Sequence, residues 1–166
     1  MTGPRAVLVG PPGSGKTTVG RLLAAELGVA FRDTDQDIER SQGKTIAEIF
    51  FDDGEEHFRA LERAAVALAL EEFDGVLSLG GGAILSEQTR ELLRPHRVVF
   101  LSVGLAAAAK RVGLARDRPV LALNPRASLH QLLEKRLPLY REVADLEVAT
   151  DDVHPAEVTT HLLSHL

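Results

Sequence analysis

The sequence predicts an α/β fold with three layers, in which a five-stranded parallel sheet lies between helices on both faces. Short apolar runs alternate with segments of helical periodicity along the chain, and this alternation is typical of a parallel sheet. The run from Val98 to Leu101 is apolar without a break, as expected for a strand covered on both faces. Since a chain of 166 residues can bury an ordinary core, we expect a single domain over residues 1–166.

The five expected strands are short, and each precedes or follows a helical segment. They cover residues 6–9, 29–32, 76–79, 98–103 and 146–149. After the first strand, apolar residues recur at helical spacing up to Gly28, which is a natural end for a helix. The longest helix should run from about Glu55 to Phe73, with an inner face made of Phe58, Leu61, Ala65, Leu68 and Ala69. Pro155 suits the first turn of a final helix that continues to Leu166.

Composition and charge exclude several classes of function. The formal net charge is −5, from 19 basic and 24 acidic residues, so the chain has no diffuse positive field for nucleic acid. Aromatic residues make up only 4% of the chain, which disfavours stacking platforms for single strands. No stretch approaches the roughly 20 apolar residues of a membrane span, and the absence of cysteine excludes disulfides and thiolate metal sites. We therefore expect a cytoplasmic protein without a nucleic-acid or membrane partner. We also expect a monomer, although composition does not determine the oligomeric state.

Residues 10–17 read Gly-Pro-Pro-Gly-Ser-Gly-Lys-Thr, which is the G-x-x-x-x-G-K-[ST] pattern between the first strand and the first helix. The glycines let backbone N–H groups converge on a polyphosphate, and the helix N-terminus adds its positive dipole end. Lys16 supplies a point charge, and the Thr17 hydroxyl is placed to coordinate Mg²⁺. The alternative is a Gly-rich turn that merely joins strand to helix. The pattern predicts a nucleoside triphosphate site made of Gly13, Ser14, Gly15, Lys16, Thr17 and Thr18.

Two carboxylates, Asp33 and Asp35, follow the second strand, at the sheet edge where ligands bind in open α/β folds. They can divide two tasks, one holding Mg²⁺ through water and the other accepting hydrogen bonds from substrate hydroxyls. The alternative is a purely structural role, because Thr34 or Asp35 would cap a helix that starts at Gln36.

Three consecutive glycines, Gly80, Gly81 and Gly82, close the third strand at the same edge. Such a run costs backbone entropy, so a close approach of another group is expected there. Exposed N–H groups could receive a carboxylate or a hydroxyl, whereas a tight turn alone would explain one glycine but hardly three.

Three arginines, Arg59, Arg118 and Arg136, are further candidates for binding an anion. Their spacing alone does not distinguish them from ordinary surface arginines. Arg59 lies on the long helix, and Arg136 lies in the segment Lys135–Tyr140. Arg118 falls in the stretch from Gly113 to Ser128, whose two prolines and three arginines indicate a mobile loop.

Taken as a set, these residues resemble shikimate kinase over nearly the whole chain. The resemblance rests on the phosphate loop, Asp33-x-Asp35, Asp53-Gly54-Glu55, Phe58-Arg59, the segment Leu77–Gly82, Arg118-Pro119 and Arg136-x-Pro138-x-Tyr140. It implies a P-loop kinase domain with a lid at about residues 113–125. It also implies transfer of the ATP γ-phosphoryl group to the 3-hydroxyl of shikimate, a step toward chorismate and the aromatic amino acids.

The resemblance also implies a role for each matched residue. Asp35 would bind the shikimate hydroxyls and act as the base, while Arg59, Arg136 and the amides of the triple glycine would hold the carboxylate. Lys16, Thr17 and Asp33 would manage the phosphates with Mg²⁺, and Ser78 would touch a metal-bound water. Arg118 would close with the lid onto the transferring group, and Arg111 and Pro155 would flank the adenine.

One segment departs from the family pattern. Residues 150–155 are acidic where family members often carry a basic residue near the adenine.

Two other functions are alternatives to shikimate phosphorylation. A kinase for gluconate or a nucleoside monophosphate would share the phosphate loop, but the triple glycine and Arg136 favour an acceptor with a carboxylate. A nucleotide-gated switch is disfavoured because the chain has no N-K-x-D motif for guanine. The six histidines do not cluster at ligand spacing.

Overall fold

The computed structural model describes residues 3–104 and 125–166, with the side chains of the second segment described from residue 131. Five parallel strands form one sheet in the order β2-β3-β1-β4-β5. Their bounds are β1 Ala6–Val9, β2 Phe31–Asp33, β3 Val76–Ser78, β4 Val98–Ser102 and β5 Leu146–Ala149. The predicted five-stranded parallel sheet is therefore confirmed, with each strand within two residues of its expected start.

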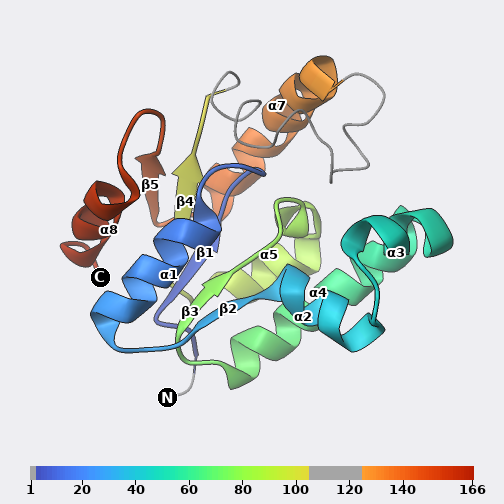
Figure 1. Cartoon of the computed structure of the whole chain (residues 1–166), viewed down its shortest axis with the longest axis horizontal. Coiled ribbons are helices and arrows are strands. Elements are labelled where there is room, and N and C mark those ends of the chain that lie inside the picture. Colours follow the sequence, from blue (N-terminus) through green and yellow to red (C-terminus); the bar gives the residue numbers. More distant parts are fainter. Residues whose placement is uncertain (1–2, 105–124) are drawn as a thin grey trace.

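Helices cover both faces of this sheet, which confirms the predicted three layers (Figure 1). On one face lie α1 (Lys16–Leu27) and α8 (Pro155–Leu163). On the other lie α4 (Glu55–Glu72), α5 (Glu87–Leu93) and α7 (Pro125–Val143), with the short 3₁₀ turn η1 (Ala83–Leu85). Beside the edge strand β2 lies α2 (Thr34–Gln42), and α3 (Ile46–Asp53) packs on α2 and α4. Among the described helices, none is both long and apolar enough to cross a bilayer.

Strand β1 explains why the central strands are apolar on both faces. Successive side chains of a strand point to opposite faces. Val7 and Val9 pack toward α4, α5 and α7, whereas Ala6 and Leu8 pack toward α1 and α8. All four residues are at most 1% exposed, so the apolar run fits a strand buried between two helix layers.

Helix α3 was not expected from the sequence, although a local signal marks its start. Thr45 and Glu48 form a capping box, in which each side chain accepts a hydrogen bond from the backbone N–H of the other residue. Together with α2 and α4, helix α3 builds a separate small core around Ile38, Ile49 and Phe58.

Two expectations about the helices were wrong in detail. Leu68 was expected on the inner face of α4, but it is 51% exposed. It lines the groove toward α2 with Leu61 and Ala65, and no described helix covers its outer side. The last helix ends at Leu163 and not at Leu166, since the next backbone N–H groups turn back to the carbonyls of Thr160 and Leu162.

Candidate active site

The phosphate loop follows β1 and leads directly into α1. Gly15 is the N-cap of α1 with φ of 93°, a left-handed conformation that glycine adopts without strain. The Lys16 ammonium lies over the loop, because its Nζ donates to the carbonyl oxygens of Gly10 at 2.7 Å and Pro11 at 3.0 Å. A cation, converging amides and a helix N-terminus thus meet at one place, as phosphate binding requires.

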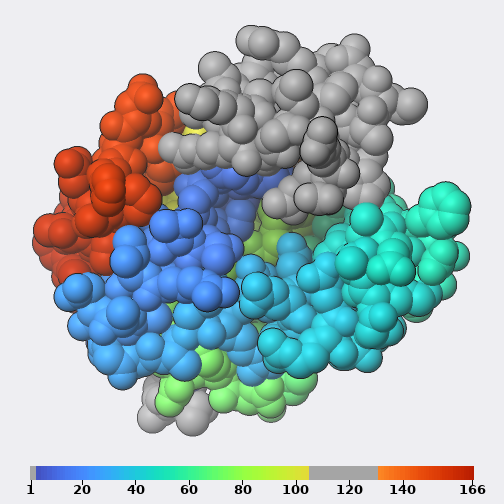
Figure 2. Space-filling model, in the orientation of Figure 1, coloured from blue at the N-terminus to red at the C-terminus, as the bar shows by residue number. Residues whose placement is uncertain are grey.

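A cavity opens beside this loop at the carboxyl edge of the sheet. It is lined by Pro12, Gly13, Gly15, Lys16, Thr17, Thr18, Asp33, Asp35, Ser78, Leu79, Gly80 and Gly81. In Figure 2 the surface is hollowed between the blue segment that contains the loop and the cyan segment that contains α2. The cavity therefore brings together the phosphate loop, the two predicted carboxylates and the start of the triple glycine.

Ser14 is the one residue of the predicted nucleotide-binding set within the loop that does not line this cavity. Its side chain is fully buried and packs against Gly10, where a Cβ would lie 2.8 Å from the Ser14 hydroxyl oxygen. Its carbonyl accepts a hydrogen bond from the Thr150 hydroxyl at 2.9 Å. The backbone N–H of Thr150 donates to the Ser102 carbonyl at 2.8 Å, so Thr150 ties the ends of β4 and β5 to the phosphate loop.

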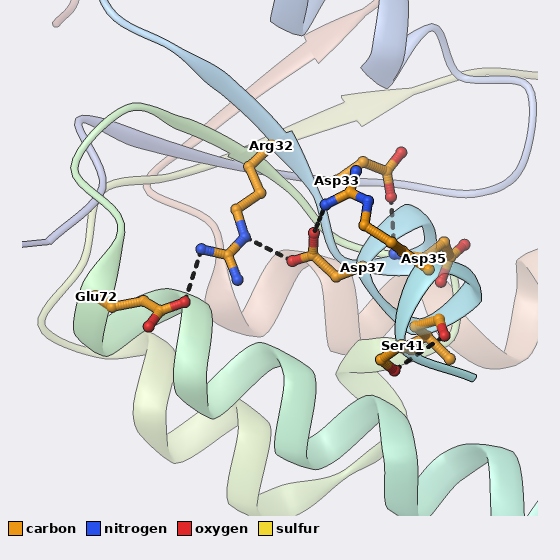
Figure 3. A network of polar contacts seen from close by, with 8 residues as sticks. Arg32, Asp33, Asp35, Asp37, Ser41 and Glu72 are labelled. Atoms are coloured by element: carbon orange, nitrogen blue, oxygen red, sulfur yellow. Dashed lines mark hydrogen bonds and ion pairs between the residues drawn. The ribbon is translucent and has the colours of Figure 1, made fainter. Parts of the chain in front are cut away.

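Asp33 lies at the end of β2 and caps helix α2 (Figure 3). Its Oδ1 accepts a hydrogen bond from the backbone N–H of Asp35 at 2.9 Å. The structural alternative had named Thr34 or Asp35 as the cap, and that assignment was wrong because α2 begins two residues earlier than expected. Burial raises the pKa of Asp33, while the amides of Asp35 and Gln36 and the charge of Lys16 oppose this shift.

The three glycines after β3 each face a different part of the site. A Cβ at Gly80 would lie 2.5 Å from Oδ1 of Asp35, and a Cβ at Gly81 would lie 3.0 Å from Pro12. A Cβ at Gly82 would overlap the guanidinium of Arg59. A tight turn alone therefore does not explain the run, because each glycine allows one close contact with α2, the phosphate loop or α4.

Arg59 projects from α4 toward this turn and is held by neighbours on its own helix. Its Nη1 donates to Glu62 at 2.8 Å, and its Nη2 pairs with Glu55 at 3.3 Å. The guanidinium carbon lies 5.3 Å from the ring centre of Phe58 and 6.0 Å from that of Phe50. Sequence reasoning missed Glu62 and these rings, although Glu62 stands three residues after Arg59, the spacing of a helical ion pair.

Arg136 approaches the same turn from α7. It is 7% exposed, and burial lowers the pKa of its guanidinium. Glu62, which is 3% exposed, lies near both arginines, and burial raises the pKa of its carboxyl against their charges. Two guanidinium groups therefore lie near one buried carboxylate beside the glycine turn. This pair of guanidinium groups suits a single organic anion.

Other predicted residues lie outside this assembly or outside the described residues. Pro155 begins α8 after the N-cap His154 and does not line the cavity. In the acidic loop, both carboxylate oxygens of Asp151 accept from the Gly104 amide, which joins the loop to the end of β4. Arg111, Arg118 and the expected lid up to residue 124 fall outside the described residues.

Comparison with known proteins identifies relatives along the whole chain. The family model described as "Shikimate kinase" matches residues 12–166. A shikimate kinase of Saccharopolyspora erythraea is 63% identical over 98% of this chain and 94% of its own, and one of Rhodococcus jostii is 50% identical over 98% of both. Among solved structures, a shikimate kinase from Acinetobacter baumannii in complex with shikimate has a TM-score of 0.93 and 39% identity, covering 98% of this chain and 92% of its own.

Proposed function

This chain belongs to the shikimate kinase family, and on that premise we propose that it transfers the γ-phosphoryl group of ATP to the 3-hydroxyl of shikimate. The products are ADP and shikimate 3-phosphate, on the route to chorismate and the aromatic amino acids. One observation supports the choice of acceptor. Arg59 and Arg136 lie close together beside the glycine turn, and this turn also borders the phosphate cavity. A small acid bound there would present a hydroxyl toward the loop.

The phosphate half of the site holds and neutralises the nucleotide. The loop amides donate hydrogen bonds to the phosphate oxygens, and the dipole of α1 attracts their negative charge. Lys16 stabilises the charge that develops during transfer. Phosphoryl transfer passes through a loose transition state, so this half contributes alignment and charge rather than covalent chemistry. In the proposed closed state, Arg118 from the lid adds a second cation, and Arg111 and Pro155 flank the adenine.

Magnesium fits the oxygen donors of the same cavity. Thr17, Asp33 and Ser78 line it and offer hydroxyl and carboxylate oxygens, which Mg²⁺ prefers. The Ser78 hydroxyl is buried and has no hydrogen-bond partner among the described residues, so it is available to a metal-bound water. Thr17 and Asp33 would hold the ion, which would supply positive charge to the phosphates.

The acceptor half orients the acid and its hydroxyls. Arg59 and Arg136 present planar forks that match a carboxylate in two-point fashion, and the amides of Gly81 and Gly82 complete its shell. Asp35 lies against Gly80 between this shell and the phosphate loop. There its carboxylate accepts the hydrogen bond of the reacting hydroxyl and points the oxygen at the γ-phosphorus. Because the transition state is loose, the proton leaves late, and Asp35 acts more through orientation than through early deprotonation.

The proposed active form is a cytoplasmic monomer of one domain, in which a lid at about residues 113–125 closes over both substrates. Closure would exclude water, which otherwise takes the phosphoryl group. A chain without cysteine gains nothing from an oxidising compartment.

A coupled ADP-release assay tests the proposed function directly. The purified protein is given ATP and Mg²⁺ with shikimate, gluconate or a nucleoside monophosphate as the acceptor. We expect turnover with shikimate and at least about 100-fold lower kcat/KM with the others, since neither places a ring-bound carboxylate on both arginines. Faster turnover of gluconate or a nucleoside monophosphate would reject the proposed acceptor.

A further inference from the structure

Tyr140 lies beneath the acceptor half of the site and connects two of its parts. It stands one helical turn after Arg136 on α7, so both side chains project from the same face of the helix. Its hydroxyl donates to the Gly81 carbonyl oxygen at 2.5 Å. The Arg136 guanidinium interacts with the same phenol group, since its charge opposes the rise in the pKa of Tyr140. One oxygen atom therefore joins helix α7 to the triple-glycine turn.

The bond to Gly81 also sets the direction of the next peptide N–H. A peptide unit is planar and trans, so its carbonyl and the N–H of the following residue point in opposite directions. With the Gly81 carbonyl turned toward Tyr140, the Gly82 N–H points away from the tyrosine. Gly82 in turn lies against the Arg59 guanidinium. The phenol oxygen thus sits behind three groups of the proposed carboxylate shell: Arg136, the Gly82 amide and, through Gly82, Arg59.

The surroundings of the ring keep this oxygen in place. Tyr140 is 1% exposed, and its ring stacks on Phe100 of β4 with centroids 4.9 Å apart and an interplanar angle of 21°. Burial raises the pKa of Tyr140 to about 12, against the charges of Arg136 and Arg59. The hydroxyl therefore keeps its proton, and with it the bond to Gly81, across the pH range in which the protein works.

We propose that Tyr140 is a positioning residue for acid recognition, whose hydroxyl holds the Arg136 guanidinium and the Gly82 amide in the relative geometry that grips the acceptor carboxylate. This role deepens the proposed function and rests on it. Tyr140 itself makes no contact with the reacting atoms. Its loss therefore affects the affinity for the acid more than the rate of phosphoryl transfer.

The first test compares Tyr140→Phe with Phe100→Leu. Tyr140→Phe keeps the ring and removes only the hydroxyl, whereas Phe100→Leu removes the stacking partner and keeps the hydroxyl. We expect Tyr140→Phe to raise KM for shikimate about ten-fold, with kcat within about two-fold and KM for ATP unchanged. Phe100→Leu should lower Tm and leave the KM for shikimate within about two-fold. Equal effects of both variants on this KM would overturn the role of the hydroxyl.

A second measurement works even where Tyr140→Phe folds poorly. Tyr140 is the single tyrosine of the chain, so growth with 3-fluorotyrosine labels this position alone. Its ¹⁹F signal should shift on addition of shikimate and stay within line width on addition of the methyl ester of shikimate, which lacks the anionic carboxylate. A signal that ignores saturating shikimate would overturn the proposal. If the unlabelled protein does not phosphorylate shikimate at all, the proposed function fails first, which separates the two failures.

Discussion

The two halves of the proposed active site, the phosphate side and the acceptor side, are assembled in different ways. On the phosphate side, Lys16 is held by the carbonyls of Gly10 and Pro11, at most six residues away. On the acceptor side, the bond from Tyr140 to Gly81 spans 59 residues, and Arg59 reaches the same turn from a third segment. The phosphate half is thus a local structure that one motif specifies. The acceptor half exists only after the sheet has brought α4, α7 and the glycine turn together.

Removing the central cation of the phosphate half should have the largest effect. We expect Lys16→Ala to lower kcat/KM by at least about 10³-fold, because the charge that stabilises the transferring group is lost. Its side chain bonds to loop carbonyls close to it in sequence, so we expect Tm to stay within about 2 °C of wild type. ADP-release kinetics and calorimetric binding of shikimate check this. Activity within ten-fold of wild type would contradict the role of Lys16, and weaker binding of shikimate would show that the two halves are not separate.

Asp35 lies at the junction between the halves, and its variant tests to which half it belongs. We expect Asp35→Asn to lower kcat by about 10²- to 10³-fold, since the amide no longer accepts the proton of the reacting hydroxyl. ATP binding should survive, because the carboxylate faces the acceptor. Equilibrium titration with ATP and steady-state assays separate the two quantities. An equal loss of ATP affinity would assign Asp35 to the phosphate half instead.

Two glycine variants can be compared, one at Gly82 in the acceptor half and one at Gly75 outside the site. A Cβ at Gly82 would displace the Arg59 guanidinium, the free end of a flexible side chain, so function should suffer more than folding. We expect Gly82→Ala to raise KM for shikimate about ten-fold with Tm nearly unchanged.

A Cβ at Gly75, by contrast, would meet the backbone carbonyl of Ala30, which cannot move aside. Gly75→Ala should lower Tm by several degrees and leave that KM unchanged. Steady-state kinetics and thermal melts measure both quantities for each variant. The same pattern of effects in both variants would contradict the division.

The smallest expected effect concerns the stability cost of Asp33. Burial raises its pKa above the unfolded value, so its ionisation disfavours the folded state. This cost appears as the pH rises through the unfolded pKa and the folded pKa, and it is complete above both. Since asparagine caps a helix as well as aspartate does, Asp33→Asn should raise Tm by about 2 °C at neutral pH.

At about pH 3.5, where the folded protein carries Asp33 largely protonated, the difference between Asp33→Asn and wild type should be much smaller. Thermal melts at the two pH values provide the measurement. A gap that stays constant with pH would show that the carboxylate carries no burial cost.

The sequence predicted the layers of the fold well because they depend on local patterns. Strand β1 and helix α1 were found from an apolar run, helical spacing and the stop at Gly28. Helix α3 was missed although Thr45 and Glu48 form a recognisable capping box. Leu68 was assigned to the core because periodicity identifies an apolar face, whereas its exposure depends on whether another helix covers that face.

The site residues likewise fall into those that a short sequence pattern reveals and those that it does not. The phosphate loop, the two aspartates and the triple glycine were recognised as chemistry because each is a short pattern. Arg59 and Arg136 were not distinguishable by spacing from other arginines, and only the resemblance to shikimate kinase assigned them a role. The structure supplies the physical reason. Arg136 is buried near Arg59 and Glu62 of another helix, and Arg59 lies against Gly82, 23 residues further along the chain.

By itself, the sequence determined a parallel α/β sheet with a phosphate loop at its carboxyl edge, since strand burial, helix ends and loop amides depend on residues close together in the chain. Only the tertiary structure decided which glycine faces which partner and that Tyr140 of α7 bonds to Gly81. These outcomes depend on distances between segments that are separated along the chain. Such distances are set by the packing of helices on the sheet.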